Sequence, residues 1–460
     1  NFFKNIDFSK ISIMGILNLT PDSFSDGGKF IKIDKSFRHV QEMIESGANI
    51  IDFEEAITIQ TADDNVSFVG GGIQAVTDGA DITINAGTAG VTLTDITVHS
   101  AEDIDIDGGT ISVQDITLAN VVTLNGTTTF TDDTGDTTTT ITTTADASSN
   151  VGSVTITGAA VLDVNTKIDT SAGNGAVKFT STINTSTDNT PINLDIESGT
   201  GKVTVDGIIG GTANRTLGTI AINDATDDGT GEVELFDIGA GGIGSGAITV
   251  GHATTDKITL DGDLYKTGNA LFTAKTGETI DMTLAGITFT LSNKTLEFAT
   301  GTIKLANGVN LTAGTGNGAI TFHSIEGTSH EDISLTSTGT IKPGTIGASV
   351  VSGINDITIS GPSTLTGNIT AASDGDGSNG GEDAALVNFN GAVIISGDIT
   401  VDTDRVAADG AGADDDANDG AITFGSTILS ADASGDSLTI KSGSGALTFS
   451  GIIGGTTGKS

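Results

Sequence analysis

The 460-residue chain contains no cysteine and no tryptophan, one tyrosine and four prolines. Without cysteine, disulfide frameworks and thiolate metal sites are excluded. No apolar run reaches the length of about 18 residues that spans a membrane, so we expect no membrane-spanning helix. No leader of basic and then apolar residues is visible, so no signal peptide is expected in this sequence.

Basic residues are also scarce, with 19 against 59 acidic residues and a net charge of -40 at pH 7. A field of this sign repels nucleic acid and concentrates cations. Residues 1–53 hold six basic and seven acidic residues, whereas residues 54–460 hold 13 and 52. This change predicts two segments: an N-terminal segment 1–53 and an acidic segment 54–460, rich in Gly, Thr and Asp.

The first segment reads as one β-α-β unit. Residues 10–19 form a short apolar run, as in a buried parallel strand, and residues 48–52 form another. Between them, apolar residues follow the spacing of a helix face, at Phe37, Val40, Met43 and Ile44.

Two motifs carry a family resemblance. Residues 15–28, Gly-Ile-Leu-Asn-Leu-Thr-Pro-Asp-Ser-Phe-Ser-Asp-Gly-Gly, resemble the first-strand signature of dihydropteroate synthase, and residues 47–52 are similar to its second strand. That family is a pterin-binding TIM barrel that joins a pterin pyrophosphate to p-aminobenzoate, with magnesium. The resemblance implies pterin- or pyrophosphate-binding roles for Asn18, Thr20, Asp22 and Asp52. It also implies a cytoplasmic enzyme.

The family pattern breaks off after the second strand. There the family continues Gly-Gly-Glu-Ser-Thr-Arg-Pro-Gly, whereas this chain reads Phe53-Glu54-Glu55-Ala56. One β-α-β unit cannot close an eight-stranded barrel, whose active site draws on the ends of several strands. We therefore expect the chain to have no synthase activity.

The acidic segment contains repeats. Residues 194–212 return as residues 438–456, with alternate apolar residues and glycine-rich turns in both copies. Alternation at period two predicts strands, although disorder is the alternative for an acidic, glycine-rich chain. We predict a mainly β fold, a right-handed parallel β-helix (β-solenoid) with about 20 residues per coil. Val203 and Val205 should then point inward, as should Leu447 and Phe449.

The repeats of residues 57–460 resemble those of large bacterial surface adhesins, both filamentous-haemagglutinin-like and autotransporter-like. The resemblance implies a structural or adhesive protein of the cell surface or of a filament, extracellular and without catalysis. Its expected partners are cell-surface or matrix components and further copies of itself in fibres.

One acidic loop has oxygen ligands at alternate positions, as calcium loops do. Its candidate ligands are Asp374, Asp376, Ser378, Glu382 and Asp383. Ala385 stands where an EF-hand requires glutamate, so this loop is not an EF-hand. The alternative is a solvated turn between strands.

Overall fold

The computed structural model describes residues 13–16, 48–53, 56–68, 72–75, 80–98, 102–132, 137–145, 152–188, 190–215, 217–225, 229–239, 244–284, 286–306, 310–328, 331–347, 354–371, 385–404, 420–432 and 435–454. The chain divides into two compact units, Asn1–Gly207 and Ile208–Ser460. The described residues form strands and turns without any helix. They confirm a mainly β fold, whereas the helix expected near Phe37 lies outside them. The boundary expected at residue 53 remains a prediction.

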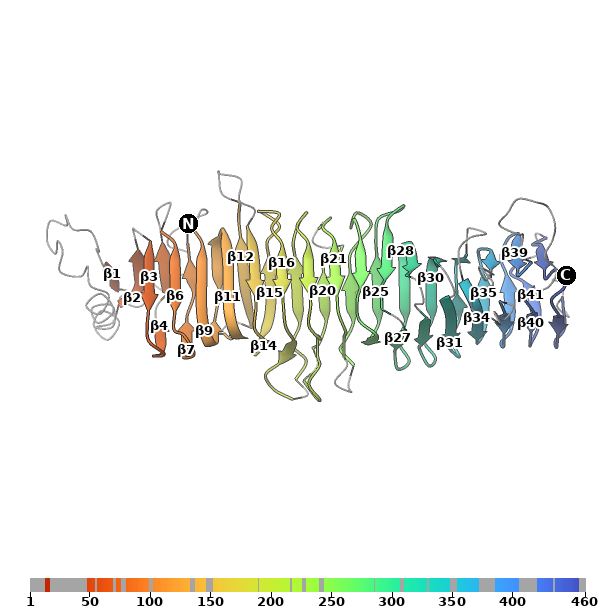
Figure 1. Ribbon diagram of the computed structural model, residues 1–460, viewed down its shortest axis with the longest axis horizontal. Helices are drawn as coiled ribbons and strands as arrows, with labels where there is room; N and C mark the ends of the chain where they lie inside the picture. Colours follow the sequence, from red (N-terminus) through yellow and green to blue (C-terminus); the bar gives the residue numbers. More distant parts are fainter. Residues whose placement is uncertain are drawn as a thin grey trace, which may run out of the picture. The chain divides into compact units, whose positions relative to one another are not determined.

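In unit 1 the described strands form three parallel ladders, in which each strand lies beside a strand from the previous turn of the chain (Figure 1). The first ladder is β1 (Ile13–Ile16), β2 (Ala48–Phe53), β5 (Gly72–Ala75), β8 (Ile96–Thr97), β10 (Ile116–Ala119), β12 (Thr138–Thr143), β15 (Asn165–Asp169) and β18 (Leu194–Glu197). The second is β3 (Ile57–Gln60), β6 (Ile82–Asn85), the first halves of β9 (Ile104–Val113) and β11 (Val121–Phe130), β13 (Ser153–Ile156), β16 (Val177–Phe179) and β19 (Val203–Val205). The third is β4 (Val66–Phe68), β7 (Gly90–Leu93), the second halves of β9 and β11, β14 (Ala160–Leu162) and β17 (Ile183–Thr185).

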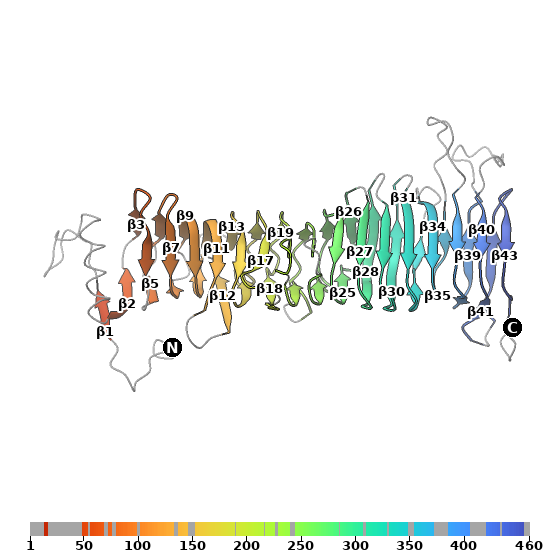
Figure 2. The same cartoon turned by 90° about the horizontal axis from the view of Figure 1, so that it is seen from below.

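Unit 2 also has three parallel ladders, which Figure 2 shows from below. The first is β20 (Ile220–Ile222), β22 (Ile248–Val250), β25 (Ala270–Thr273), the first halves of β28 (Leu296–Leu305) and β30 (Ile320–Glu326), β32 (Ile341–Lys342), β35 (Ser363–Leu365), β38 (Val393–Ile395) and β41 (Ile428–Ser430). The second is β21 (Val233–Leu235), β23 (Ile258–Leu260), β26 (Thr279–Met282), the second halves of β28 and β30, β33 (Thr345–Ile346), β36 (Ile369–Thr370), β39 (Ile399–Asp402) and β42 (Leu438–Lys441). The third is β24 (Leu264–Lys266), β27 (Ile287–Thr290), β29 (Leu311–Gly314), β31 (Glu331–Thr336), β34 (Ile354–Ser360), β37 (Val387–Phe389), β40 (Ile422–Phe424) and β43 (Leu447–Phe449).

The core of unit 1 consists of apolar residues stacked in register. Successive strands place Ile57 beside Ile82 and Ile82 beside Ile104, and all three side chains are buried. Side chains alternate between the two faces of a strand. The next residue on each of these strands, Thr58, Thr83 or Asp105, therefore lies on the outward face. The alternation in the sequence therefore sets the register, since a slip of one residue would expose the whole apolar row.

Aromatic rings continue this stacking in unit 2. The rings of Phe389 and Phe424 are 5.0 Å apart with an interplanar angle of 10°, and those of Phe424 and Phe449 are 5.4 Å apart at 8°. These distances are close to the spacing of about 4.8 Å between paired strands. The stacked rings therefore follow from the register of β37, β40 and β43.

Both repeat copies have the expected inward orientation, because Leu447 and Phe449 continue the rows of Ile422 and Phe424, but only the first copy is buried. Val203 and Val205 are 0% and 1% exposed, but Leu447 and Phe449 are 44% and 38% exposed. The burial predicted for Leu447 and Phe449 is therefore wrong. Both residues pair in register with buried Ile422 and Phe424, but β43 is the last described strand of its ladder, so no described strand covers its far side.

Candidate functional sites

Most residues predicted to bind ligands lie outside the described residues. These are Asn18, Thr20 and Asp22 of the pterin site and Asp374, Asp376, Ser378, Glu382 and Asp383 of the calcium loop. The remaining one, Asp52, lies on β2, where its backbone pairs with Ile16 on one side and Gln74 on the other. The side chain of Asp52 lies outside the described part. Within the described ranges, no group of three or more His, Asp or Glu residues is placed to hold a metal ion.

The glycine-rich loops between strands make a recurrent polar contact, which joins each loop to the corresponding loop in the next turn of the chain. In unit 1, the side-chain oxygen of Asn174 accepts the backbone N–H of Thr200 at 2.9 Å. Asn174 and Gly199 have left-handed φ angles of 55° and 60°. A Cβ on Gly199 would lie 2.5 Å from the Asn174 Oδ1 atom. The tight fit therefore requires glycine at this position.

The same arrangement occurs at two other places. In unit 1, Asp63 Oδ1 accepts the N–H of Thr88, which follows Gly87, at 2.8 Å. In unit 2, Asn293 Oδ1 accepts the N–H of Asn317, which follows Gly316, at 3.2 Å. We call this arrangement the Asx–Gly clamp. In it, the side-chain oxygen of an Asn or Asp in one loop accepts a hydrogen bond from a backbone N–H in the corresponding loop of the next turn of the chain. The donor is the residue that follows the glycine of that loop. Short polar side chains and glycine tolerate the left-handed conformation that both partners adopt.

A buried hydroxyl supports these turns from inside. The Oγ1 atoms of Thr170 and Thr315 donate to the carbonyl oxygens of Gly175 and Gly318, each at 2.6 Å. Both threonines are 0% exposed. A buried backbone carbonyl without a partner would be costly, so the hydroxyl is required where the chain bends inside the stack. The sequences Thr-Gly-x-Gly at residues 315–318 and Ser-Gly-x-Gly at residues 198–201 mark this turn, since the Ser198 hydroxyl donates to Gly201 in the same way, whereas Thr170 stands five residues before Gly175 and lacks the pattern.

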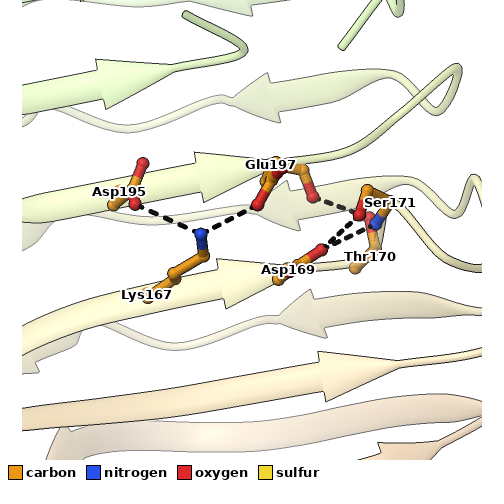
Figure 3. Close-up of polar contacts among 6 residues, drawn as sticks. All are labelled: Lys167, Asp169, Thr170, Ser171, Asp195 and Glu197. Carbon is orange, nitrogen blue, oxygen red and sulfur yellow. Dashed lines mark hydrogen bonds and ion pairs between the residues drawn. The ribbon is translucent and has the colours of Figure 1, made fainter. Parts of the chain in front are cut away.

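Some acidic residues pair with the next strand of the first ladder in unit 1 (Figure 3). The Lys167 Nζ atom of β15 lies 2.8 Å from Glu197 Oε2 and 3.7 Å from Asp195 Oδ2, both on β18. Asp169 accepts from the Ser171 N–H at 3.0 Å and from the Ser171 hydroxyl at 2.6 Å. Partly exposed pairs of this kind are each worth about 0–1 kcal/mol. They join neighbouring strands on the outward face of the ladder.

Two aspartates on β9 stand close together on one strand. Asn125 of β11 donates through Nδ2 to Asp107 Oδ1 at 2.6 Å and to Asp105 Oδ1 at 3.4 Å. Partial burial, together with repulsion from Asp107, raises the pKa of Asp105 above its ordinary value. A raised carboxylate pKa is a feature of many acid–base sites, but this pair lies on an outward strand face and faces an amide rather than a second catalytic group.

Comparison with known proteins gives a match for the N-terminal part of the chain. Residues 14–98 match the family model described as "Pterin binding enzyme". The match therefore runs past residue 53 into the strands β3 to β8. No solved structure matches the chain. No helix of the described residues is long and apolar enough to cross a membrane.

The matching relatives are folate enzymes. Dihydropteroate synthase of Clostridium beijerinckii is 47% identical over 81 residues, which are 16% of this chain and 30% of that protein. The Bacillus subtilis synthase is 63% identical over 43 residues, 9% of this chain and 15% of its own length. The mitochondrial folate synthesis bifunctional protein of Arabidopsis thaliana is 66% identical over 47 residues, 10% of this chain and 8% of that protein. The chain thus spans less than a third of these relatives, and the resemblance of its N-terminal segment to dihydropteroate synthase is confirmed.

Proposed function

We propose that the chain is a structural or adhesive protein of a bacterial cell surface or filament, without catalysis. On this proposal each unit is a right-handed parallel β-helix, a β-solenoid. The observation that carries it is the in-register parallel pairing of strands from successive turns, as in β3, β6 and β9. Each turn buries its apolar row only against its neighbours, as in repeat proteins, whose extended faces commonly serve for binding.

The charge and the turns support the same proposal. The Asx–Gly clamps and buried threonine hydroxyls give structural roles to glycine-rich motifs that resemble ligand loops. The net charge of -40 favours a hydrated surface that does not bind nucleic acid. The proposed partners are cell-surface or matrix components, the proposed location is extracellular, and calcium is the proposed ligand of the loop at residues 374–383.

Protease accessibility tests the proposed location. Intact producing cells are treated with an external protease, and the chain is followed by an antibody against residues 420–454. We expect the chain to be cleaved while a cytoplasmic marker protein stays intact. Cleavage only after the cells are lysed would contradict the proposal.

The alternative to this proposal is a synthase of the dihydropteroate type, for which the family match at residues 14–98 is the supporting observation. The full chain should be assayed with a pterin pyrophosphate, p-aminobenzoate and magnesium. We expect no turnover, because the Gly-Gly-Glu-Ser-Thr-Arg-Pro-Gly segment of that family is missing after Asp52 and a barrel active site needs the ends of several strands. Turnover that disappears in Asn18→Ala would establish the enzyme instead.

A further inference from the structure

One corner of unit 1 buries three polar side chains inside the stack. Glu102, Asn120 and Thr143 are 0%, 1% and 1% exposed. They belong to three successive turns of the chain, because Glu102 precedes β9, Asn120 precedes β11 and Thr143 ends β12. The Asn120 N–H donates to the Glu102 carbonyl oxygen at 2.8 Å, and β12 places Thr143 beside Ala119. We call Glu102, Asn120 and Thr143 the polar corner.

Two oxygen atoms of the polar corner have no hydrogen-bond partner in the described part of the chain. They are Oδ1 of Asn120 and Oγ1 of Thr143, and both are buried. The Nδ2 atom of Asn120 donates to Asp103 Oδ1 at 2.9 Å, so Oδ1 is the amide atom that remains without a bond. A buried polar atom without a partner has lost its hydrogen bonds to water and gained none in return. Both oxygens are therefore available to a small ligand.

Thr143 differs from the threonine at the same position of the next turn. Strands β12 and β15 pair in register, so Thr143 and Thr170 occupy equivalent positions. The Thr170 hydroxyl donates to the Gly175 carbonyl oxygen, whereas the Thr143 hydroxyl makes no such bond. It lies close to Gly152 instead, since a Cβ added to Gly152 would be 2.8 Å from Thr143 Oγ1. In the second ladder Gly152 lies beside Asn120, so the hydroxyl is close to the inward position that Asn120 occupies one turn earlier.

The charge of the polar corner is that of one carboxylate, since Asn120 and Thr143 are neutral. The adjacent Asp103 is only half-buried, and alternation places it on the outward face. Residues 39–166, which include all three turns, contain no lysine or arginine. Buried charges in proteins are paired or bind metal ions, and carboxylate, amide and hydroxyl oxygens are ligands of hard cations. A monovalent cation balances the single carboxylate charge, whereas a divalent cation would leave a buried positive charge.

We propose that the polar corner binds a monovalent alkali-metal cation, sodium or potassium. Its ligands are a carboxylate oxygen of Glu102, Oδ1 of Asn120 and Oγ1 of Thr143. One ion bound here joins three successive turns and stabilises their register from inside the stack. This internal site is independent of the proposed surface function and of the proposed calcium loop at residues 374–383. A buried water molecule can also bridge such oxygens, and it is the alternative outcome of the experiment.

Hydrogen exchange of the full-length chain, followed by mass spectrometry, tests the site. The chain is compared in sodium chloride, potassium chloride and choline chloride of equal ionic strength, because the bulky choline ion does not fit inside the stack. At about ten times its Kd, a bound cation should make opening of the corner about elevenfold rarer, by the factor 1 + [L]/Kd. Amides of residues 102–125 should therefore exchange about elevenfold more slowly in sodium or potassium chloride than in choline chloride. Amides of β23 and β26 in unit 2 should exchange equally in all three salts.

Glu102→Gln tests the carboxylate, since it keeps the shape of the side chain and removes the charge. This variant should exchange equally fast in all three salts. The matched control is Thr170→Val, which removes an equally buried hydroxyl that already has a backbone partner, and it should keep the difference between the salts. Equal exchange of the wild-type chain in the three salts would overturn the proposal and indicate a buried water molecule. A salt difference that persists in Glu102→Gln would overturn it as well.

Discussion

The Asx–Gly clamp of unit 2 gives a prediction whose magnitude follows from two separate effects. Gly316 has φ +62°, and a Cβ there would lie 2.6 Å from Asn293 Oδ1. In Gly316→Ala, the left-handed backbone costs about 1–2 kcal/mol. Displacement of the Asn293 amide also removes its hydrogen bond with the Asn317 N–H, worth about 0.5–1.5 kcal/mol. We expect a total loss of about 2–3 kcal/mol in the free energy of unfolding.

Gly277 provides the matched control. It has φ +92°, and a Cβ added there would have nothing within 4 Å apart from its chain neighbours, so Gly277→Ala should show only the backbone cost of about 1–2 kcal/mol. In an Asn293→Ala background, Gly316→Ala should fall to the same cost, which gives a coupling of about 1 kcal/mol in a double-mutant cycle. Urea unfolding measures all of these variants, and hydrogen exchange reports the Asn317 amide directly. Equal costs for the two glycine substitutions would refute the steric part of the argument.

Four further predictions concern charge and packing. Burial and repulsion from Asp107 raise the pKa of Asp105. Protonated Asp105 therefore contributes to stability at acidic pH, and this contribution is lost as the pH rises through the pKa of the folded state. Asp105→Asn should therefore raise the melting temperature at pH 7. The pKa of Asp436 is lowered from 3.8, chiefly by the Ser430 hydroxyl, so its contribution is present above that value and lost as the pH falls below it; Asp436→Asn should flatten the acid limb of the stability profile. Phe424→Ala should cost about 3–5 kcal/mol in urea unfolding, because this 0% exposed ring lies between two others. Calcium should raise the melting temperature more than sodium chloride of equal ionic strength, and the double variant Asp374→Asn, Asp376→Asn should remove the difference; equal effects of the two salts would indicate screening alone.

The strand content could be predicted because apolar residues alternate through most of the acidic segment. Residues such as Ile82 and Ile84 are buried while Thr83 between them is less so, and a period of two produces this pattern only in a strand. The number of residues in each turn of the chain was harder to predict from the sequence. Side-chain contacts between neighbouring strands span 18, 22 or 32 residues, because loops of different length leave the register of the ladder unchanged. The separation between paired strands therefore varies around the predicted 20 residues per coil, and a single period does not describe it.

The polar contacts were harder to predict than the strands. Nothing in the local sequence distinguishes Asn174, which holds Thr200, from an ordinary turn asparagine, because its partner lies 26 residues away. The exposure of Leu447 and Phe449 was also missed, since burial depends on a neighbouring strand and not on the residue itself. The predicted pterin and calcium residues remain predictions, apart from the backbone position of Asp52 on β2.

The family match covers the first strands of the ladders, from β1 to β8, and β2 lies among them. Its backbone pairs with β1, which the family match also covers, and on the other side with β5, where Ile51 lies beside Ile73 and Phe53 beside Ala75. A parallel strand presents similar N–H and C=O groups on both edges, so a strand with the sequence of an α/β enzyme can pair with a strand of a stacked ladder. This pairing requires only the strand direction and an apolar row in register, and it does not require the helices that close a barrel. Similarity at β1 and β2 therefore carries information about strand formation, whereas synthase activity depends on the loops and later strands of the barrel.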